Sequence, residues 1–155
     1  MAGPDEPEDG TMMINPDLLE YARTMIRGDY DANDAVEARL DADADGWDGF
    51  PRFLAAMFFL AVDRRFGVGA GRPEVIKFVA DLRAGLGEGG PDIQPDAAEQ
   101  LILSIIDPSI DYEISQAMIG RVQAATVQKI FTEGDLSDAE LDALLAEAAQ
   151  LAQRD

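Results

Sequence analysis

The sequence predicts an all-α protein, a compact bundle of six to seven helices around a central apolar helix at about residues 50–66. Apolar residues recur at three- and four-residue spacing along most of the chain, which is typical of helices with one buried face. Pro and Gly residues stand where these periodic segments begin and end. No stretch bounded by turn residues alternates apolar with polar side chains, so we expect no β-sheet.

The first 13 residues differ in composition from the rest. They are rich in Pro, Gly, Asp and Glu and offer little apolar surface to bury. We predict a disordered acidic tail over 1–13 and a single helical domain over 14–155. The tail lacks the basic and apolar regions of a signal peptide, and the longest apolar run, Phe53 to Val62, is too short to span a bilayer. We therefore expect a cytoplasmic location, and the composition, with only two Lys, suggests a bacterial source.

Capping signals mark the first predicted helix, and a weaker apolar pattern marks the second. Asn15 is a favourable N-cap, Pro16 suits the first helical position, and Gly28 ends the segment. A weaker helix is predicted over 33–40, followed by a loop over 41–49.

The helix predicted over 50–66 is apolar almost all round, so we expect it to be buried. Large side chains gather on it or just before it: Trp47, Phe50, Phe53, Met57, Phe58, Phe59 and Phe66. Such a cluster at helical spacing is typical of a core. The alternative is a groove that receives a helix of a partner.

Proline and a capping box mark the later helices. Pro73 opens one segment, Pro95 opens the next, and a long helix is predicted over 110–131. In the last helix Ser137 and Glu140 stand three residues apart, the spacing at which each side chain accepts a hydrogen bond from the other's backbone N–H.

Composition excludes several classes of function. The chain has no Cys and no His, which removes thiolate nucleophiles, the commonest general base and the usual zinc and haem ligands. Its 31 acidic and 12 basic residues give a net charge of −19. This charge opposes binding to nucleic acid through its phosphates. We expect a protein that is not an enzyme and that binds neither nucleic acid nor a membrane.

The segment that begins at Asp41 has the pattern D-x-D-x-D-G, which brings three carboxylates to one hard cation. It resembles an EF-hand calcium loop, and the resemblance covers about one helix-loop-helix unit. Carried over by position, Asp41, Asp43 and Asp45 would supply side-chain ligands, and Trp47 its carbonyl oxygen.

The second half of this loop departs from the EF-hand pattern. Arg52 stands where a bidentate Glu is normal, Pro51 precedes it, and Asp48 takes an ordinarily aliphatic position. The resemblance therefore implies weak calcium binding at 41–48. The alternative is a surface linker in which Asp48 caps the following helix. No other cofactor is expected.

The last helix carries a possible contact surface for a partner. Leu141, Leu144, Ala148 and Leu151 have the 3-4-3 spacing of a coiled-coil seam. These residues either pack against their own bundle or bind across a dimer. We expect a monomer or a homodimer.

The function favoured by these observations is a non-catalytic acidic helical module for protein–protein interaction: an adaptor, accessory or regulatory protein. Its partner would be another protein with a basic surface, because a strongly acidic protein attracts basic partners. Three alternatives stay open. They are calcium binding at 41–48, mimicry of nucleic acid by carboxylates, and a small-molecule pocket beside the 50–66 helix.

Overall fold

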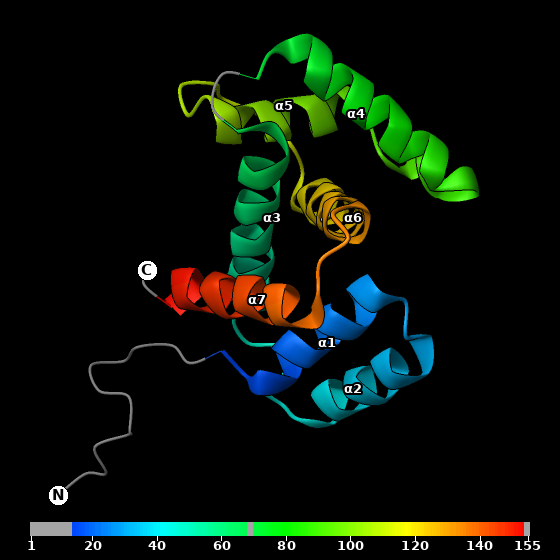
Figure 1. Cartoon of the computed structure of the whole chain (residues 1–155), viewed down its shortest axis with the longest axis vertical. Helices are drawn as coiled ribbons and strands as arrows, with labels where there is room; N and C mark the ends of the chain where they lie inside the picture. The colour runs from blue at the N-terminus through cyan, green and yellow to red at the C-terminus, as the bar shows by residue number, and fades with distance from the viewer. Residues whose placement is uncertain (1–13, 68–69, 154–155) are drawn as a thin grey trace, which may run out of the picture. The chain divides into compact units, whose positions relative to one another are not determined.

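The computed structural model describes residues 14–67 and 70–153, and it confirms the all-α class (Figure 1). Within these ranges there are seven α-helices, one 3-10 helix and no strand. The helices are α1 (Pro16–Arg27), α2 (Tyr30–Ala42), α3 (Phe50–Phe66), α4 (Arg72–Gly85), η1 (Gly87–Asp92), α5 (Pro95–Ile106), α6 (Gln116–Glu133) and α7 (Asp138–Gln153). The acidic tail predicted over 1–13 lies outside the described residues.

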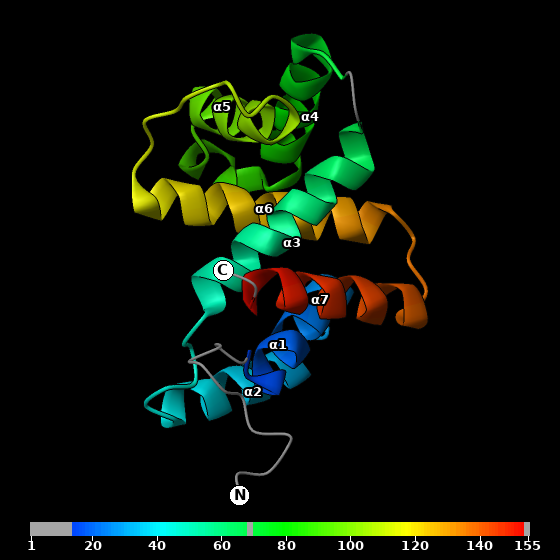
Figure 2. The same ribbon diagram turned by 90° about the vertical axis from the view of Figure 1, so that its left-hand side faces the viewer.

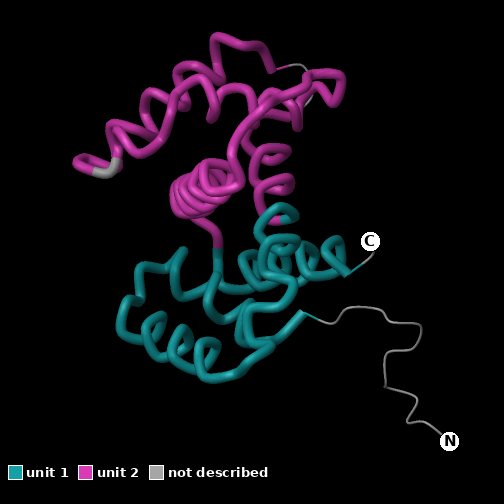
Figure 3. Tube along the Cα trace, turned by 180° about the vertical axis from the view of Figure 1, so that it is seen from behind, with its two compact units in different colours: residues 1–56, 137–155 teal, residues 57–136 magenta. Residues whose placement is uncertain are grey.

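The described chain divides into two compact units (Figure 3). Unit 1 contains the described residues up to 56 and from 137 onward, and unit 2 contains residues 57–136. The boundary falls inside α3, after Ala56. The single domain expected over 14–155 stays a prediction.

In unit 1, α1 packs against α2 and α7. The predicted caps of α1 are confirmed: the Asn15 side chain accepts a hydrogen bond from the Asp17 N–H, and Gly28 ends the helix at φ +72°. The capping box of α7 is also formed. The Glu140 N–H donates to Ser137 Oγ (3.1 Å), and the Ser137 N–H donates to Glu140 Oε1 (2.9 Å).

In unit 2, α4 packs against η1, α5 and α6, and α5 packs against α6 (Figure 1, Figure 2). The 3-10 segment lies close to α4, because a Cβ built on Gly90 would be 2.4 Å from the Arg83 carbonyl oxygen. Arg83 Nε also donates to the Ile93 carbonyl oxygen at 2.9 Å. The largest fully buried side chains of this unit include Phe58, Phe131 and Ile102.

Two predicted starts are wrong. The second helix begins before the predicted 33–40 segment, because the Asp29 carboxylate accepts from the Ala32 N–H and caps an earlier turn. The same helix extends to Ala42, so Asp41 is helical rather than part of a loop.

The sixth helix starts later than the predicted 110–131 segment. Ser115 is its N-cap, with Oγ accepting from the Met118 N–H. Upstream, the Asp107 carboxylate accepts from both the N–H and the hydroxyl of Ser109, and these bonds lower the pKa of Asp107. Local side-chain bonds of this kind compete with helix formation.

The expectation that α3 is buried all round is met only in part. Its buried side chains are Phe53, Leu54, Ala56, Met57, Phe58, Ala61, Val62 and Phe66. Phe59, in contrast, is 45% exposed, and Phe50 is half-buried. No helix among the described residues, α3 included, combines the length and the apolar character that a membrane crossing requires.

Candidate functional site

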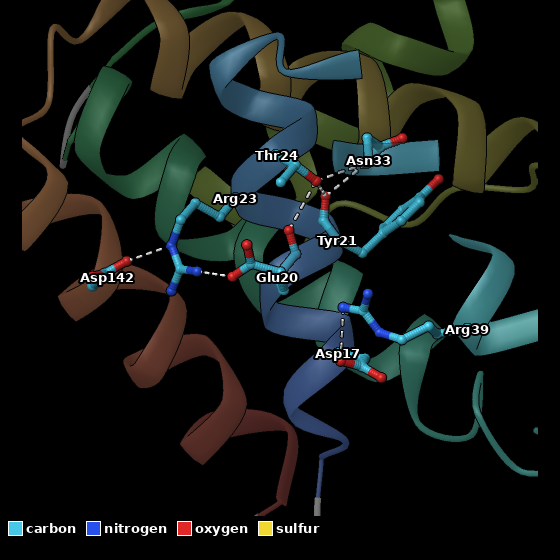
Figure 4. A network of polar contacts seen from close by, with 8 residues as sticks. All are labelled: Asp17, Glu20, Tyr21, Arg23, Thr24, Asn33, Arg39 and Asp142. Atoms are coloured by element: carbon cyan, nitrogen blue, oxygen red, sulfur yellow. Dashed lines mark hydrogen bonds and ion pairs between the residues drawn. The ribbon is translucent and has the colours of Figure 1, made fainter. Parts of the chain in front are cut away.

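Ion pairs attach α7 to α1 in unit 1 (Figure 4). Arg23 pairs with Glu20 on its own helix, and its Nε lies 2.7 Å from Oδ1 of Asp142 on α7. One turn further along α1, Arg27 Nη2 lies 3.0 Å from Asp138 Oδ1. These arginines are therefore occupied by carboxylates of the same unit.

A second set of polar contacts fixes α1 against α2. Asn33 Nδ2 donates to Thr24 Oγ1 and to the Tyr21 carbonyl oxygen, each at 3.0 Å (Figure 4). The Thr24 hydroxyl donates to the Glu20 carbonyl oxygen at 2.9 Å. Thr24 is buried, so these bonds satisfy a polar group that water cannot reach. The backbone that carries Tyr21 is held in place as a result.

Tyr21 belongs to an aromatic cluster, which we define as Tyr21, Trp47 and Phe50. The ring centroids are 5.1 Å apart for Tyr21–Trp47, 5.9 Å for Tyr21–Phe50 and 5.3 Å for Trp47–Phe50. The ring planes meet at 82–84°, so each pair is edge-to-face. All three side chains are half-buried. The cluster is therefore ordered by ring packing and still reaches the surface.

Carboxylates on α2 flank this cluster. Asp41 Oδ1 accepts a hydrogen bond from Trp47 Nε1 at 2.8 Å and so orients the indole. Burial raises the pKa of the Tyr21 phenol, and the negative charges of Glu37 and Asp41 raise it further. The phenol is therefore neutral at pH 7. The two carboxylates beside it are exposed to water. We call Tyr21, Trp47, Phe50, Glu37 and Asp41 together the aromatic–acidic surface.

The loop that carries Trp47 is held tightly against α2. A Cβ built on Gly46 would be only 2.4 Å from the Leu40 carbonyl oxygen, so only glycine fits there without a shift. The Gly46 N–H donates to the Asp43 carbonyl oxygen at 3.0 Å. The Trp47 carbonyl oxygen accepts from the Phe50 N–H, also at 3.0 Å. The close approach of Gly46 to Leu40 thus positions the Trp47 indole in the cluster.

The predicted calcium ligands are not brought together. Asp41 lies in the last turn of α2 and binds the Trp47 indole, whereas the Asp43 carboxylate accepts from the Asp45 N–H at 3.1 Å. In the part of the chain that the structure describes, no three acidic side chains form a group that could hold a metal ion. Calcium binding stays a prediction.

The four residues of the predicted contact surface on α7 differ in how far they are buried. Leu141 and Ala148 are completely buried, whereas Leu144 and Leu151 are half-buried. The four side chains thus do not form one exposed seam. Their role in binding a partner stays a prediction.

Unit 2 contains a cavity of about 310 Å³ between α4 and α6. Its wall includes Leu82, Leu86 and Ala125, with Lys129 and Glu133 forming an ion pair of 2.5 Å at its side. The volume is at the small end of the range for ligand pockets. A small-molecule ligand stays an alternative.

Unit 2 also contains an edge-to-face aromatic pair. The Phe66 and Phe78 centroids are 5.3 Å apart, at 77°. The Arg65 guanidinium lies over both rings, 5.1 Å from Phe66 and 5.7 Å from Phe78, and Lys129 Nζ lies 5.8 Å from the Phe78 centroid. Cations of the chain itself therefore cover this pair.

No family model matches the chain, and no curated protein or solved structure is significantly similar to it. Function therefore has to be inferred from the residues of this chain alone.

Sequence reasoning found Trp47 and Asp41 but gave them a different role, and it missed Tyr21 and Glu37. One signal was available. Asn33, Glu37 and Asp41 are spaced four residues apart, which places them on one helix face once α2 is known to extend to Ala42. The pairing of that face with Tyr21 needed the fold.

Proposed function

We propose that this protein is a non-catalytic interaction module of the bacterial cytoplasm that binds a basic segment of another protein. The observation that carries the proposal is the half-buried aromatic cluster flanked by Glu37 and Asp41. Aromatic faces attract cations, and carboxylates pair with them through charge-assisted hydrogen bonds. Both features lie on one surface of unit 1, which suits a partner with exposed Lys or Arg side chains.

The charge of unit 1 supports this proposal. Its described residues include 14 acidic and four basic side chains, a net charge of −10. Arg23, Arg27 and Arg39 each pair with a carboxylate of the unit, and a large negative surplus is left. Such a surplus steers a basic partner toward the surface and repels an acidic one.

The chemistry of the aromatic–acidic surface favours binding over catalysis. Its functional groups are a phenol, an indole and two carboxylates that are exposed to water. Catalytic acids and bases, in contrast, are usually placed in closed clefts where the environment tunes their proton affinity. The chain supplies no His or Cys to act beside them.

The experiment that tests the proposal is titration of the full chain into a fluorescein-labelled basic peptide, followed by anisotropy at low salt. The double variant Glu37→Gln/Asp41→Asn removes two charges from the aromatic–acidic surface. The matched control is Asp111→Asn/Glu113→Gln, which removes two exposed charges from the segment of unit 2 between α5 and α6.

We expect the site variant to weaken binding about tenfold and the control to change it less than about twofold, because near charges act more strongly than remote ones in salt. Equal weakening by both variants would indicate binding to net charge alone and would overturn the proposal. Absence of binding by the wild-type chain would also overturn it.

A further inference from the structure

We propose that the aromatic–acidic surface selects arginine over lysine in the basic segment that it binds. This inference rests on the proposed function and goes further, because it names the side chain that is recognised. It depends on two observations: the ring geometry of the aromatic cluster, and the way the chain's own arginine binds a similar ring arrangement in unit 2.

The Phe66–Phe78 pair shows how a guanidinium sits on rings of this geometry. Arg65 covers both rings, with its guanidinium carbon 5.1 and 5.7 Å from the two centroids, whereas the contact of Lys129 is with the Phe78 ring, 5.8 Å from its centroid. Planar stacking on aromatic faces is a property of the guanidinium, whose weak hydration makes the loss of water inexpensive. One arginine thus makes cation–π contacts with two edge-to-face rings at once.

The aromatic cluster offers a similar arrangement at the surface of unit 1. Its centroid separations of 5.1–5.9 Å and its angles of 82–84° resemble the 5.3 Å and 77° of the Phe66–Phe78 pair. The charged groups that act on Tyr21 here are carboxylates rather than cations. A basic segment of a partner would bring a cation to these rings, as Arg65 does to the rings of unit 2.

The carboxylates favour arginine for a second reason. A guanidinium presents its N–H groups as a planar fork, so it donates two parallel hydrogen bonds to one carboxylate while its face stays on a ring. Asp41 uses Oδ1 to orient the Trp47 indole, and Glu37 supplies a second carboxylate on the same helix face. A lysine ammonium is a compact, strongly hydrated charge and cannot stack in this way.

Two labelled peptides with the same length and charge test the inference. Each is a Gly/Ser peptide, one with three Arg and the other with three Lys, and both are titrated with the full chain and followed by anisotropy. We expect the wild-type protein to bind the Arg peptide about tenfold more tightly. Phe50→Leu removes one ring of the cluster, and we expect it to reduce this ratio to about twofold or less.

Two further variants separate recognition from folding. Tyr21→Phe keeps the ring and should keep the ratio. Phe59→Leu removes an exposed ring from the same helix but outside the cluster, and it should also keep the ratio. Circular dichroism establishes that each variant retains its helix content.

Each outcome decides between the proposals. Equal binding of the two peptides, still weakened by Glu37→Gln/Asp41→Asn, would leave the proposed function standing and overturn arginine selection. A loss of the ratio in Phe59→Leu as large as that in Phe50→Leu would also overturn it. If neither peptide binds, both proposals fail.

Discussion

The described residues include two groups of edge-to-face aromatic rings, and the charged side chains beside the two groups have opposite sign. In unit 2, Arg65 and Lys129 lie over the Phe66–Phe78 pair. In unit 1, the cluster around Trp47 is flanked by carboxylates. Cations of the chain thus lie over the rings in unit 2, whereas carboxylates lie beside the rings that form the proposed recognition surface in unit 1.

The two buried threonines extend this comparison. Thr24 in unit 1 exchanges hydrogen bonds with Asn33 and the preceding turn of α1. Thr126 in unit 2 is completely buried, and its hydroxyl finds no partner among the described residues. In unit 1 the buried threonine thus helps to fix α1 against α2, whereas in unit 2 the hydroxyl of Thr126 adds no such contact.

The largest expected effect comes from adding a methyl group at the two tightest glycines. In Gly46→Ala and Gly90→Ala the new Cβ would lie 2.4 Å from a backbone oxygen. We expect each variant to lose about 1–3 kcal/mol of unfolding free energy, measured in urea, because the backbone must shift. Only Gly46→Ala should also weaken binding of the Arg peptide, since Gly46 positions Trp47.

Gly120→Ala is the matched control for these glycines. A Cβ at Gly120 meets nothing within 4 Å, and the residue lies inside α6. Alanine is the better helix former, so we expect a gain of about 0.5–1 kcal/mol. Equal weakening of peptide binding by Gly46→Ala and Gly90→Ala would contradict a recognition surface confined to unit 1.

The buried threonines should respond with opposite signs to replacement by valine. Thr24→Val breaks a satisfied network and leaves the Asn33 amide short of an acceptor, so we expect a loss of about 1 kcal/mol. Thr126→Val removes an unsatisfied hydroxyl at nearly constant volume, so we expect a gain of about 1 kcal/mol. Changes of the same sign in urea unfolding would refute the comparison.

Helix caps in the two units test whether they unfold together. Ser137→Ala removes the cap of α7 in unit 1, and Ser115→Ala removes the cap of α6 in unit 2. Each should cost about 1 kcal/mol. If 14–155 is one domain, Ser115→Ala should also shift the unfolding seen by Trp47 fluorescence, although Trp47 belongs to unit 1. If Ser115→Ala leaves the unfolding transition seen by Trp47 fluorescence unchanged, the two units unfold separately.

The smallest expected effect concerns the stability of the protein in alkali. Burial and the two carboxylates raise the pKa of Tyr21 above its ordinary value of 10.0. The unfolded chain therefore releases the proton first, so the contribution of the neutral phenol is complete below pH 10 and is lost as pH rises through the raised value. Unfolding free energy should fall less steeply above pH 10 in Tyr21→Phe than in the wild type. Identical alkaline profiles would argue against the buried, carboxylate-flanked phenol.

Local rules predicted the parts of the fold that depend on local chemistry. The caps at Asn15, Gly28 and Ser137 are formed by nearest neighbours in sequence, and all were predicted correctly. The start of α6 was missed because apolar periodicity continues upstream, where Asp107 and Ser109 bond to each other instead. Competition between local side-chain bonds and helix formation is hard to weigh without the fold.

The candidate site was less accessible to sequence reasoning. Trp47 and Asp41 drew attention through an EF-hand-like pattern, and the structure joins them by an indole–carboxylate hydrogen bond that this pattern does not predict. Tyr21 lies 26 positions before Trp47 in sequence, and only the packing of α1 against α2 and the following loop brings the rings together. Spacing rules describe one helix at a time, so they do not predict a contact between residues of different elements such as Tyr21 and Trp47.

The indole N–H resonance of Trp47 provides the most direct test of the recognition surface. The chain has one Trp, so this NMR signal identifies itself without assignment of the spectrum. On addition of the Arg peptide to the full chain, we expect the signal to shift progressively and to saturate. A Trp47 signal that stays in place while other resonances shift and saturate would contradict binding at this surface.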